Sequence, residues 1–336
     1  MTDSTKNEAS GRYRVIDTHA HIVLEETFGA AGKYGPRLGV NHKNIPFFEI
    51  GDYQMPSIDY RGTIFMDLSQ RIDFMEDLGI DLQLLSPNPL TMFHKIDASS
   101  ATEYCQIQND NLAKVVQNNQ DYFLGSAALP IQDPIAACKE AERATKELNF
   151  SAISIGTDLP FTLDDPILDD FYKTLVELDI PLFLHPASTG GVKGPDDARL
   201  ERFDLTVLLG YAYEETLAIA TLILGGVTKR HPKLDICISH GGGAIALLWE
   251  KFELLCKVRE WAPDHVKKNG FRSELKKLWF DSHVEGNAAE NLLVDLIGKD
   301  RLVYGTNLGG WDTPKELNMI AKELTGNAEK LLRITA

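Results

Sequence analysis

The feature that most constrains the fold is a regular alternation of short apolar runs with longer helical patterns along the chain. Each apolar run is followed by Gly, Pro, Ser, Asp or His, which is typical of a buried parallel strand. The runs lie at 13–18, 82–86, 122–128, 151–156, 181–185, 234–239, 278–282 and 302–306. Eight strands separated by helices predict an α/β protein with a (β/α)₈ TIM barrel, and a doubly wound open sheet is the alternative.

Helical patterns occupy the segments between these strands, at 67–78, 101–119, 134–148, 168–178, 205–229, 244–260 and 288–297. The Asp-Pro pairs at 133–134 and 165–166 predict a helix N-cap followed by a first-turn proline. Residues 23–62, directly after the first strand, break this rhythm and are rich in Gly, Pro and aromatic residues. Because a loop of this length in a compact domain is usually functional, we predict a long insertion loop that acts as a lid.

Composition narrows the class of protein. With 43% hydrophobic and 25% charged residues the chain has an ordinary globular composition, and its formal charge of −15 argues against a nucleic-acid surface. The four cysteines have no Cys-x-x-Cys spacing, which indicates reduced thiols in the cytoplasm. Residues 1–12 are polar, without a signal peptide, and are predicted to be disordered, whereas 13–336 are expected to form a single domain. No apolar run approaches the roughly 18 residues of a membrane span.

Four of the nine histidines stand at predicted strand ends. His19 and His21 directly follow the first predicted strand, and residues i and i+2 of an extended strand point to the same side. His185 closes the fifth strand and His240 the sixth. Because barrel active sites lie at the carboxyl ends of the strands, these side chains are expected to meet there. Three imidazoles would bind a divalent metal and leave one position open for water or substrate.

The same motifs resemble the amidohydrolase superfamily, in the branch of 2-amino-3-carboxymuconate-6-semialdehyde decarboxylase and related aromatic-acid decarboxylases. The resemblance rests on His19-x-His21, His185-Pro186 and His240-Gly-Gly-Gly. It extends from about residue 13 to the C-terminus through further matches at 109–112, 123–125, 148–157, 225–227, 232–234 and 297–300.

The resemblance implies a (β/α)₈ barrel in which His19, His21, His185 and a strand-eight carboxylate bind zinc, with manganese or iron as alternatives. It implies that His240 is the catalytic acid or base. It also implies a homodimer, and an arginine of the insertion that binds a carboxylate of a small-molecule substrate. Arg61 stands at the matching place and is predicted to be catalytic and substrate-binding.

Two positions depart from the pattern of the branch. The strand-eight position expected to carry the carboxylate is Asn307, whose amide ligates a metal more weakly and cannot act as a base. An engineered substitution, a divergent subfamily and replacement by a nearby carboxylate, Asp281 or Asp312, are the open explanations. Where the branch has a tryptophan after the His-Pro pair, this chain has Ala187. Ala187 and Trp311 are therefore predicted to line the substrate pocket.

The leading functional hypothesis is nonoxidative decarboxylation of a small aromatic or muconate-type carboxylic acid. The metal would polarise a substrate oxygen, His240 would deliver a proton to carbon, and the planar guanidinium of Arg61 would bind carboxylate oxygens. Hydrolysis of a C–C, ester or lactone bond by metal-bound hydroxide is the main alternative. A metal-dependent oxygenase and a catalytically altered partner subunit of an active homologue are more remote.

Overall fold

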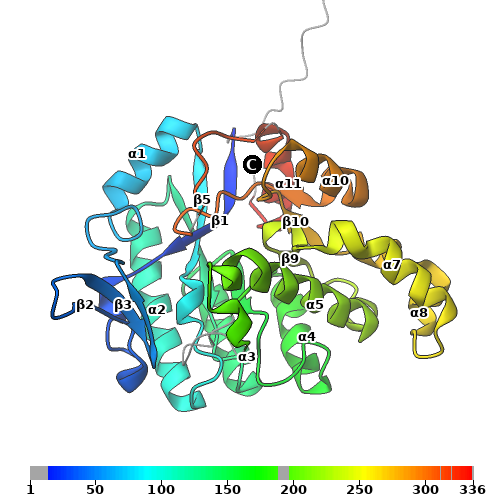
Figure 1. Cartoon of the computed structure of the whole chain (residues 1–336), viewed down its shortest axis with the longest axis horizontal. Coiled ribbons are helices and arrows are strands. Elements are labelled where there is room, and N and C mark those ends of the chain that lie inside the picture. Colours follow the sequence, from blue (N-terminus) through cyan, green and yellow to red (C-terminus); the bar gives the residue numbers. More distant parts are fainter. Residues whose placement is uncertain (1–13, 188–196, 311, 319, 335–336) are drawn as a thin grey trace, which may run out of the picture.

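Eight parallel strands form the centre of the computed structural model, which describes residues 14–187, 197–310, 312–318 and 320–334 (Figure 1). They follow one another around the sheet in chain order, and all of the predicted strands are confirmed. The predicted disordered segment 1–12 lies outside the described residues. The strands are β1 (Ile16–Ile22), β5 (Leu82–Pro87), β6 (Phe123–Ala128), β7 (Ala152–Gly156), β8 (Leu182–His185), β9 (Ile236–Ile238), β10 (Trp279–Asp281) and β11 (Leu302–Val303).

The first and last strands meet through the residues that follow β11. The amide of Thr18 donates to the carbonyl of Tyr304 at 2.8 Å, and that of His21 donates to the carbonyl of Leu308 at 2.7 Å. An isolated parallel bridge joins Ala20 to Leu308. The sheet is thus a nearly closed (β/α)₈ barrel, as predicted, and the strand-eight loop lies directly against the His-x-His motif.

Helices surround the strands on the outside of the barrel (Figure 1). Asp133 caps α3 by accepting hydrogen bonds from the amides of Ile135 and Ala136, as its Asp-Pro signal predicts. Asp165 likewise caps the short 3₁₀ helix Pro166–Leu168 that leads into α4. The helices are α1 (Leu68–Leu78), α2 (Ala98–Asn118), α3 (Pro134–Lys146), α4 (Asp169–Leu178), α5 (Tyr211–Leu224), α6 (Val227–Arg230), α7 (Ile245–Val258), α8 (Asp264–Asn269), α9 (Phe271–Leu275), α10 (Asn287–Ile297) and α11 (Thr325–Leu331).

The continuous helix predicted over 205–229 is wrong, because the segment is divided. A π-helical turn, Thr206–Gly210, precedes α5, and Gly226 at φ 78° separates α5 from α6. Within the described part of the chain, Thr206–Leu224 is long and apolar enough to span a membrane by length and composition, contrary to the prediction that no run has this length. Only 39% of this apolar stretch is buried in the structure, and its buried side chains pack on the barrel. A barrel helix meets the same criterion, so this is weak support for a membrane span.

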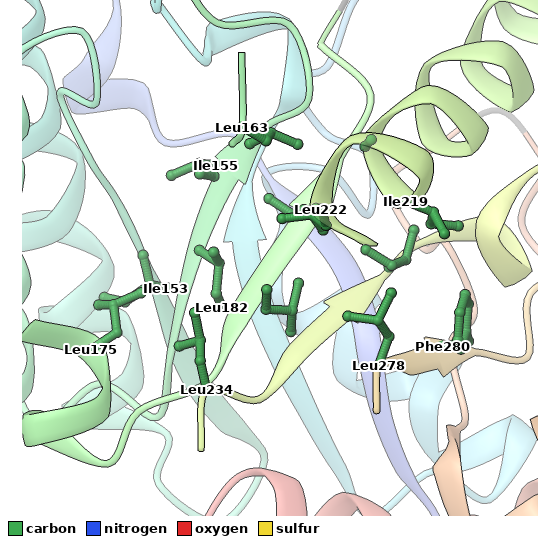
Figure 2. Packing of buried hydrophobic residues seen from close by; sticks show 14 of the residues in the cluster. Ile153, Ile155, Leu163, Leu175, Leu182, Ile219, Leu222, Leu234, Leu278 and Phe280 are labelled. Carbon is green, nitrogen blue, oxygen red and sulfur yellow. The ribbon is translucent and has the colours of Figure 1, made fainter. Parts of the chain in front are cut away.

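The main core lies between the strands and the helices that cover them. Figure 2 shows Ile153, Ile155 and Leu182 of the barrel facing residues of the covering helices, including Leu175 of α4 and Leu222 of α5. All of these side chains are buried. Truncating such a residue to alanine costs about 2–5 kcal/mol, so this layer fixes the strand ends that carry the site.

The segment after β1 is not the irregular loop that the sequence predicts. It contains an antiparallel sheet of three strands, β2 (Arg37–Val40), β3 (Pro46–Ile50) and β4 (Tyr53–Pro56). Gly51 at φ 51° begins the two-residue turn between β3 and β4, which is a typical hairpin connection. Phe48 and Tyr60 bury their rings against each other and share a cluster with Tyr104 of α2. Its function as a lid stays a prediction.

Candidate metal centre and active site

Three buried imidazoles converge at the carboxyl end of the barrel. His19 and His21 come from β1 and His185 from the last residue of β8. Their ring centroids are 5.0, 5.1 and 4.7 Å apart. One ligand nitrogen from each lies within 4.8 Å of the other two. The structure therefore brings the three histidines of the predicted metal site together.

Hydrogen bonds place the ring proton of each neutral imidazole on Nδ1. His19 Nδ1 donates to a carboxylate oxygen of Asp281 at 2.6 Å, and His185 Nδ1 donates to the carbonyl of Pro186 at 2.8 Å. His21 Nδ1 donates to Ser86 Oγ at 2.8 Å, because that hydroxyl gives its own proton to the carbonyl of Ala20. Each Nε2 atom therefore carries a free lone pair.

These free lone pairs face one another. His19 Nε2 and His21 Nε2 are 3.1 Å apart, and His185 Nε2 is buried without a hydrogen-bond partner. Burial lowers the pKa of His19 to about 4, although Asp281 opposes this shift. Burial and the neighbouring imidazoles hold the pKa values of His21 and His185 well below their usual range. Three neutral nitrogen donors directed at one point are the ligand set of a divalent cation.

A fourth imidazole stands beside the three. His240 follows β9, and its ring centroid is 4.9 Å from those of both His19 and His185. Its Nδ1 lies 2.6 Å from Oε1 of Glu215, a fully buried carboxylate on α5 that also accepts from Ser239 Oγ. Burial would lower the pKa of His240, but the charge and hydrogen bond of Glu215 outweigh it and raise the pKa to about 9. The pairing with Glu215 therefore favours the protonated form of His240, which can act as an acid.

The strand-eight loop turns the amide of Asn307 toward Asp312. Asn307 has φ 54°, and its Nδ2 donates to Asp312 Oδ1 at 2.6 Å. A Cβ atom at Gly310 would lie 2.2 Å from Asn307 Oδ1, so the amide packs over this glycine and tolerates no side chain there. Asp312 Oδ2 in turn lies 3.1 Å from His283 Nε2. Metal ligation by Asn307 stays a prediction.

Asp281 orients the metal centre from outside. One of its oxygens accepts from His19, and the other accepts from the amides of Gly241 at 3.0 Å and His283 at 3.1 Å. Burial would raise the pKa of Asp281, but the attraction of His19 lowers it below the usual range. A carboxylate behind a ligating imidazole fixes the ring and its tautomer, so these contacts support an orienting function. Replacement of the missing ligand by Asp281 stays a prediction.

Sequence comparison identifies the family of the chain. A family model described as amidohydrolase matches residues 16–334. The chain belongs to the amidohydrolase family.

Among relatives, this amidohydrolase is 29% identical over 306 residues to the 2-amino-3-carboxymuconate-6-semialdehyde decarboxylase of Dictyostelium discoideum. The matched region covers 87% of this chain and 80% of that protein. It is 27% identical over 316 residues to the 2-keto-4-carboxy-3-hexenedioate hydratase of Sphingobium sp. (strain NBRC 103272 / SYK-6), covering 90% of this chain and 83% of that one. A solved structure of a dihydroxybenzoic acid decarboxylase from Polaromonas sp. JS666, with bound manganese and the inhibitor 2-nitroresorcinol, has the same fold. Its TM-score is 0.73 at 21% identity, covering 96% of this chain and 97% of that one.

The predicted substrate-binding residues of the amidohydrolase are more dispersed than its histidines. Arg61 is 51% exposed, forms an ion pair with Glu25 at 2.8 Å and lies over the ring of Phe28. Among the described contacts, it makes none with the four histidines. Ala187 is buried at the barrel end, where it packs against Gly156. Trp311 lies outside the described residues. The functions of these three residues stay predictions.

A buried network that the sequence did not reveal supports the metal centre. Arg71 donates to the carbonyl of His21 at 2.5 Å and to Gln83 Oε1 at 2.8 Å. Gln83 donates to Asp17 at 2.7 Å, and Asp17 accepts from the amide and hydroxyl of Thr306 at 2.9 and 2.6 Å. Burial lowers the pKa of Arg71 to about 10, so the guanidinium remains charged at neutral pH. The network fixes β1 and the strand-eight loop relative to each other.

Arg71→Met is expected to destabilise the protein by at least about 3 kcal/mol, because buried acceptors at His21 and Gln83 lose their donor. Denaturant unfolding of the metal-free protein measures this loss. Arg199→Met is the matched control, since Arg199 is 89% exposed and, among the described residues, pairs only with Asp197, and we expect no measurable change. Equal stability of the two variants would mean that the network does not support the fold.

Proposed function

We propose that this chain is a metal-dependent decarboxylase of a small aromatic or muconate-type carboxylic acid. The observation that carries the proposal is the position of His240, paired with the buried carboxylate of Glu215, beside three imidazoles whose Nε2 lone pairs are free. The carboxymuconate-semialdehyde decarboxylase from Dictyostelium discoideum supports this reaction class. Dihydroxybenzoic acid, as in the similar solved structure, is an example of the substrate chemistry we propose.

The residues of the site would have two functions in the reaction: three histidines bind the cation, and His240 donates a proton. A divalent cation held by His19, His21 and His185 would polarise a substrate oxygen and stabilise the negative charge that develops. When the bond to the carboxyl carbon breaks, carbon dioxide leaves and the electron pair stays on the substrate carbon. His240 then donates its Nε2 proton to that carbon, while Glu215 holds Nδ1 and stabilises the imidazolium before transfer. Reprotonation of His240 from solvent completes the cycle.

The metal itself is proposed only as a divalent cation with preference for imidazole. Zinc, manganese and iron all accept such ligands. The similar dihydroxybenzoic acid decarboxylase binds manganese, which supports including manganese beside zinc. Loading metal-free protein with each ion in turn identifies the one that restores activity.

Metal removal is expected to abolish carbon dioxide release. Metal-replete protein should release carbon dioxide from at least one member of a panel of hydroxybenzoates and muconate-type acids. Chelator-treated protein should release none until a divalent ion is returned, because no described side chain replaces the charge of the cation between the three imidazoles. No release across the panel by metal-replete protein would contradict the decarboxylase proposal.

Addition of water is the second candidate reaction, because one relative is named a hydratase. Hydration and hydrolysis both need a base to activate water, whereas the pairing with Glu215 favours the acidic form of His240. Product formed in oxygen-18 water separates the reactions, since only water addition places the label in the organic product. Oxygen uptake by iron-loaded protein tests the oxygenase alternative. The intact histidines argue against a catalytically altered partner subunit.

We also propose a cytoplasmic homodimer. All four cysteines are free, which suits a reducing compartment. Large apolar side chains of the π-helical turn, α5 and α7 are exposed, including Leu208 at 65% and Leu247 at 77%. A second copy of the chain would bury such a surface. Sedimentation equilibrium should give a dimer mass, and Leu247→Glu should shift the protein toward the monomer.

A further inference from the structure

We propose that Tyr211 binds the carboxylate of the substrate and thereby selects the acids that the site accepts. Tyr211 is the first residue of α5, directly after the π-helical turn Thr206–Gly210. Its ring centroid lies 6.2 Å from that of His185 and 6.4 Å from that of His240. Tyr211 thus stands beside one imidazole of the three-histidine site and beside the proposed proton donor. The inference rests on the proposed decarboxylation and deepens it.

The geometry of the reaction places the carboxylate near this tyrosine. In a decarboxylation, the carbon that loses carbon dioxide is the carbon that receives the proton. The carboxylate must therefore leave from a point close to His240, while a neighbouring substrate oxygen binds the cation at the three imidazoles. The ring centroids of His185 and His240 are only 4.9 Å apart. A substrate that contacts both the cation and His240 therefore lies within reach of the Tyr211 side chain.

The start of α5 directs two side chains toward the same imidazole. Residues i and i+4 of a helix share a face, and Tyr211 and Glu215 are such a pair. Glu215 Oε1 lies 2.6 Å from His240 Nδ1, so the helix face that carries Tyr211 is the one turned toward His240. π-helical turns such as the one that precedes Tyr211 occur frequently at functional sites. The helix thus presents a carboxylate and a phenol to one ring.

The hydroxyl of Tyr211 is available to a ligand. Among the described residues it makes no hydrogen bond, whereas the buried Tyr172 donates to the carbonyl of Leu163 at 2.7 Å. Tyr211 is partly exposed, so a small molecule can reach it. The ordinary pKa of a phenol is about 10, and burial raises the pKa of Tyr211 further, so the hydroxyl keeps its proton at neutral pH. It therefore remains a hydrogen-bond donor.

Two arginines of this region do not supply the contact in the structure. Arg61 forms an ion pair with Glu25 at 2.8 Å. All three guanidinium nitrogens of Arg71 already donate within the protein, to two backbone carbonyls and to Gln83. A neutral donor also suits a carboxylate that loses its charge during the reaction. It orients the group without the strong ionic bond that would stabilise the ground state.

The test measures binding of two probes to zinc-loaded, full-length protein by calorimetry. 2-Nitrophenol carries two acceptor oxygens where a 2-hydroxybenzoate carries its carboxylate, and it cannot lose carbon dioxide. Phenol lacks this group. Tyr211→Phe keeps the ring and removes the hydroxyl, so it should weaken 2-nitrophenol binding about 3- to 10-fold and leave phenol binding unchanged. Tyr213→Phe, at a tyrosine of the same helix that is 63% exposed, is the matched control and should bind both probes normally.

Kinetics separate a substrate-binding function from a structural one. For any acid that the wild type decarboxylates, Tyr211→Phe should raise KM about 10-fold with little change in kcat, because it removes one hydrogen bond to a charged group. The melting temperature should stay that of the wild type, since the hydroxyl has no partner among the described residues to lose. A lower melting temperature with an unchanged KM would show a structural function and overturn the inference.

The outcomes also separate this inference from the proposed function. Equal binding of 2-nitrophenol by the wild type and Tyr211→Phe would overturn the inference and leave the decarboxylase proposal intact. A wild type that binds 2-nitrophenol no more tightly than phenol would overturn it as well. Weaker 2-nitrophenol binding in Tyr211→Phe, without carbon dioxide release from any acid, would support the contact with the planar acceptor group and contradict only the decarboxylase proposal.

Discussion

His240→Asn is expected to lower kcat for decarboxylation by about 10²–10⁴-fold, the usual contribution of a positioned general acid. The structure places this imidazole 4.9 Å, centroid to centroid, from His19 and His185, and the buried carboxylate of Glu215 raises its pKa and favours its protonated form. Manganese binding to the three-histidine site should remain as in the wild type, because His240 is not among the ligands. Steady-state kinetics and metal analysis of the same preparation measure both quantities.

Glu215→Gln tests the cause of the protonation. Glu215 raises the pKa of His240 to about 9, so removing its charge must lower that pKa. The fraction of protonated His240 at a given pH then falls, and the alkaline limb of the kcat profile should move to lower pH. His42→Asn, at an exposed histidine, is the control and should leave the profile unchanged. An unaltered alkaline limb in Glu215→Gln would exclude His240 as the acid.

His185→Ala is expected to abolish high-affinity metal binding at the three-histidine site, and with it the activity. Loss of a group that hydrogen-bonds a ligating histidine, as Asp281 does, typically costs about 10- to 100-fold in metal affinity, and loss of a ligand should cost more. In the wild type, metal at about 100 times its Kd should stabilise the folded state by about 2.7 kcal/mol. Thermal unfolding with and without metal should show this shift in the wild type and a much smaller one in His185→Ala.

Asp281→Asn provides the graded comparison for that experiment. The amide still lies behind His19 but no longer carries the charge that favours a proton on Nδ1. We expect intermediate metal affinity, between those of the wild type and His185→Ala. If all three proteins gave the same metal-dependent stabilisation, the ion would not bind at these histidines.

The barrel and its three central histidines could be predicted because their signals are local. Each strand is a short apolar run that ends in a polar residue, and His19, His21 and His185 stand at such ends. A strand places residues i and i+2 on one side whatever the rest of the chain does. The structure therefore had only to confirm which ends meet.

The supporting residues could not be predicted, because their signals depend on tertiary contacts. Glu215 lies in an otherwise apolar helix, and nothing in the sequence pairs it with His240, which is 25 positions away. The Arg71–Gln83–Asp17 network joins three elements through side chains alone. Its members look like ordinary helix and strand residues until the fold brings them together.

The insertion shows a different limit. Its short strands, β2 to β4, are interrupted by glycines and prolines, so their pattern is similar to that of a loop. The burial of Phe48 and Tyr60 against α2 supplies the packing that isolated hairpins lack. The position of Asn307 relative to Asp312 likewise depends on a left-handed backbone and on the space above Gly310.

Anomalous diffraction at the manganese edge, from crystals of manganese-loaded protein, tests the central claim most directly. We predict a strong peak bonded to the Nε2 atoms of His19, His21 and His185, with His240 beside it and not bound to it. A peak bonded through Nδ1 of any of the three, or no peak between them at saturating manganese, would contradict the account.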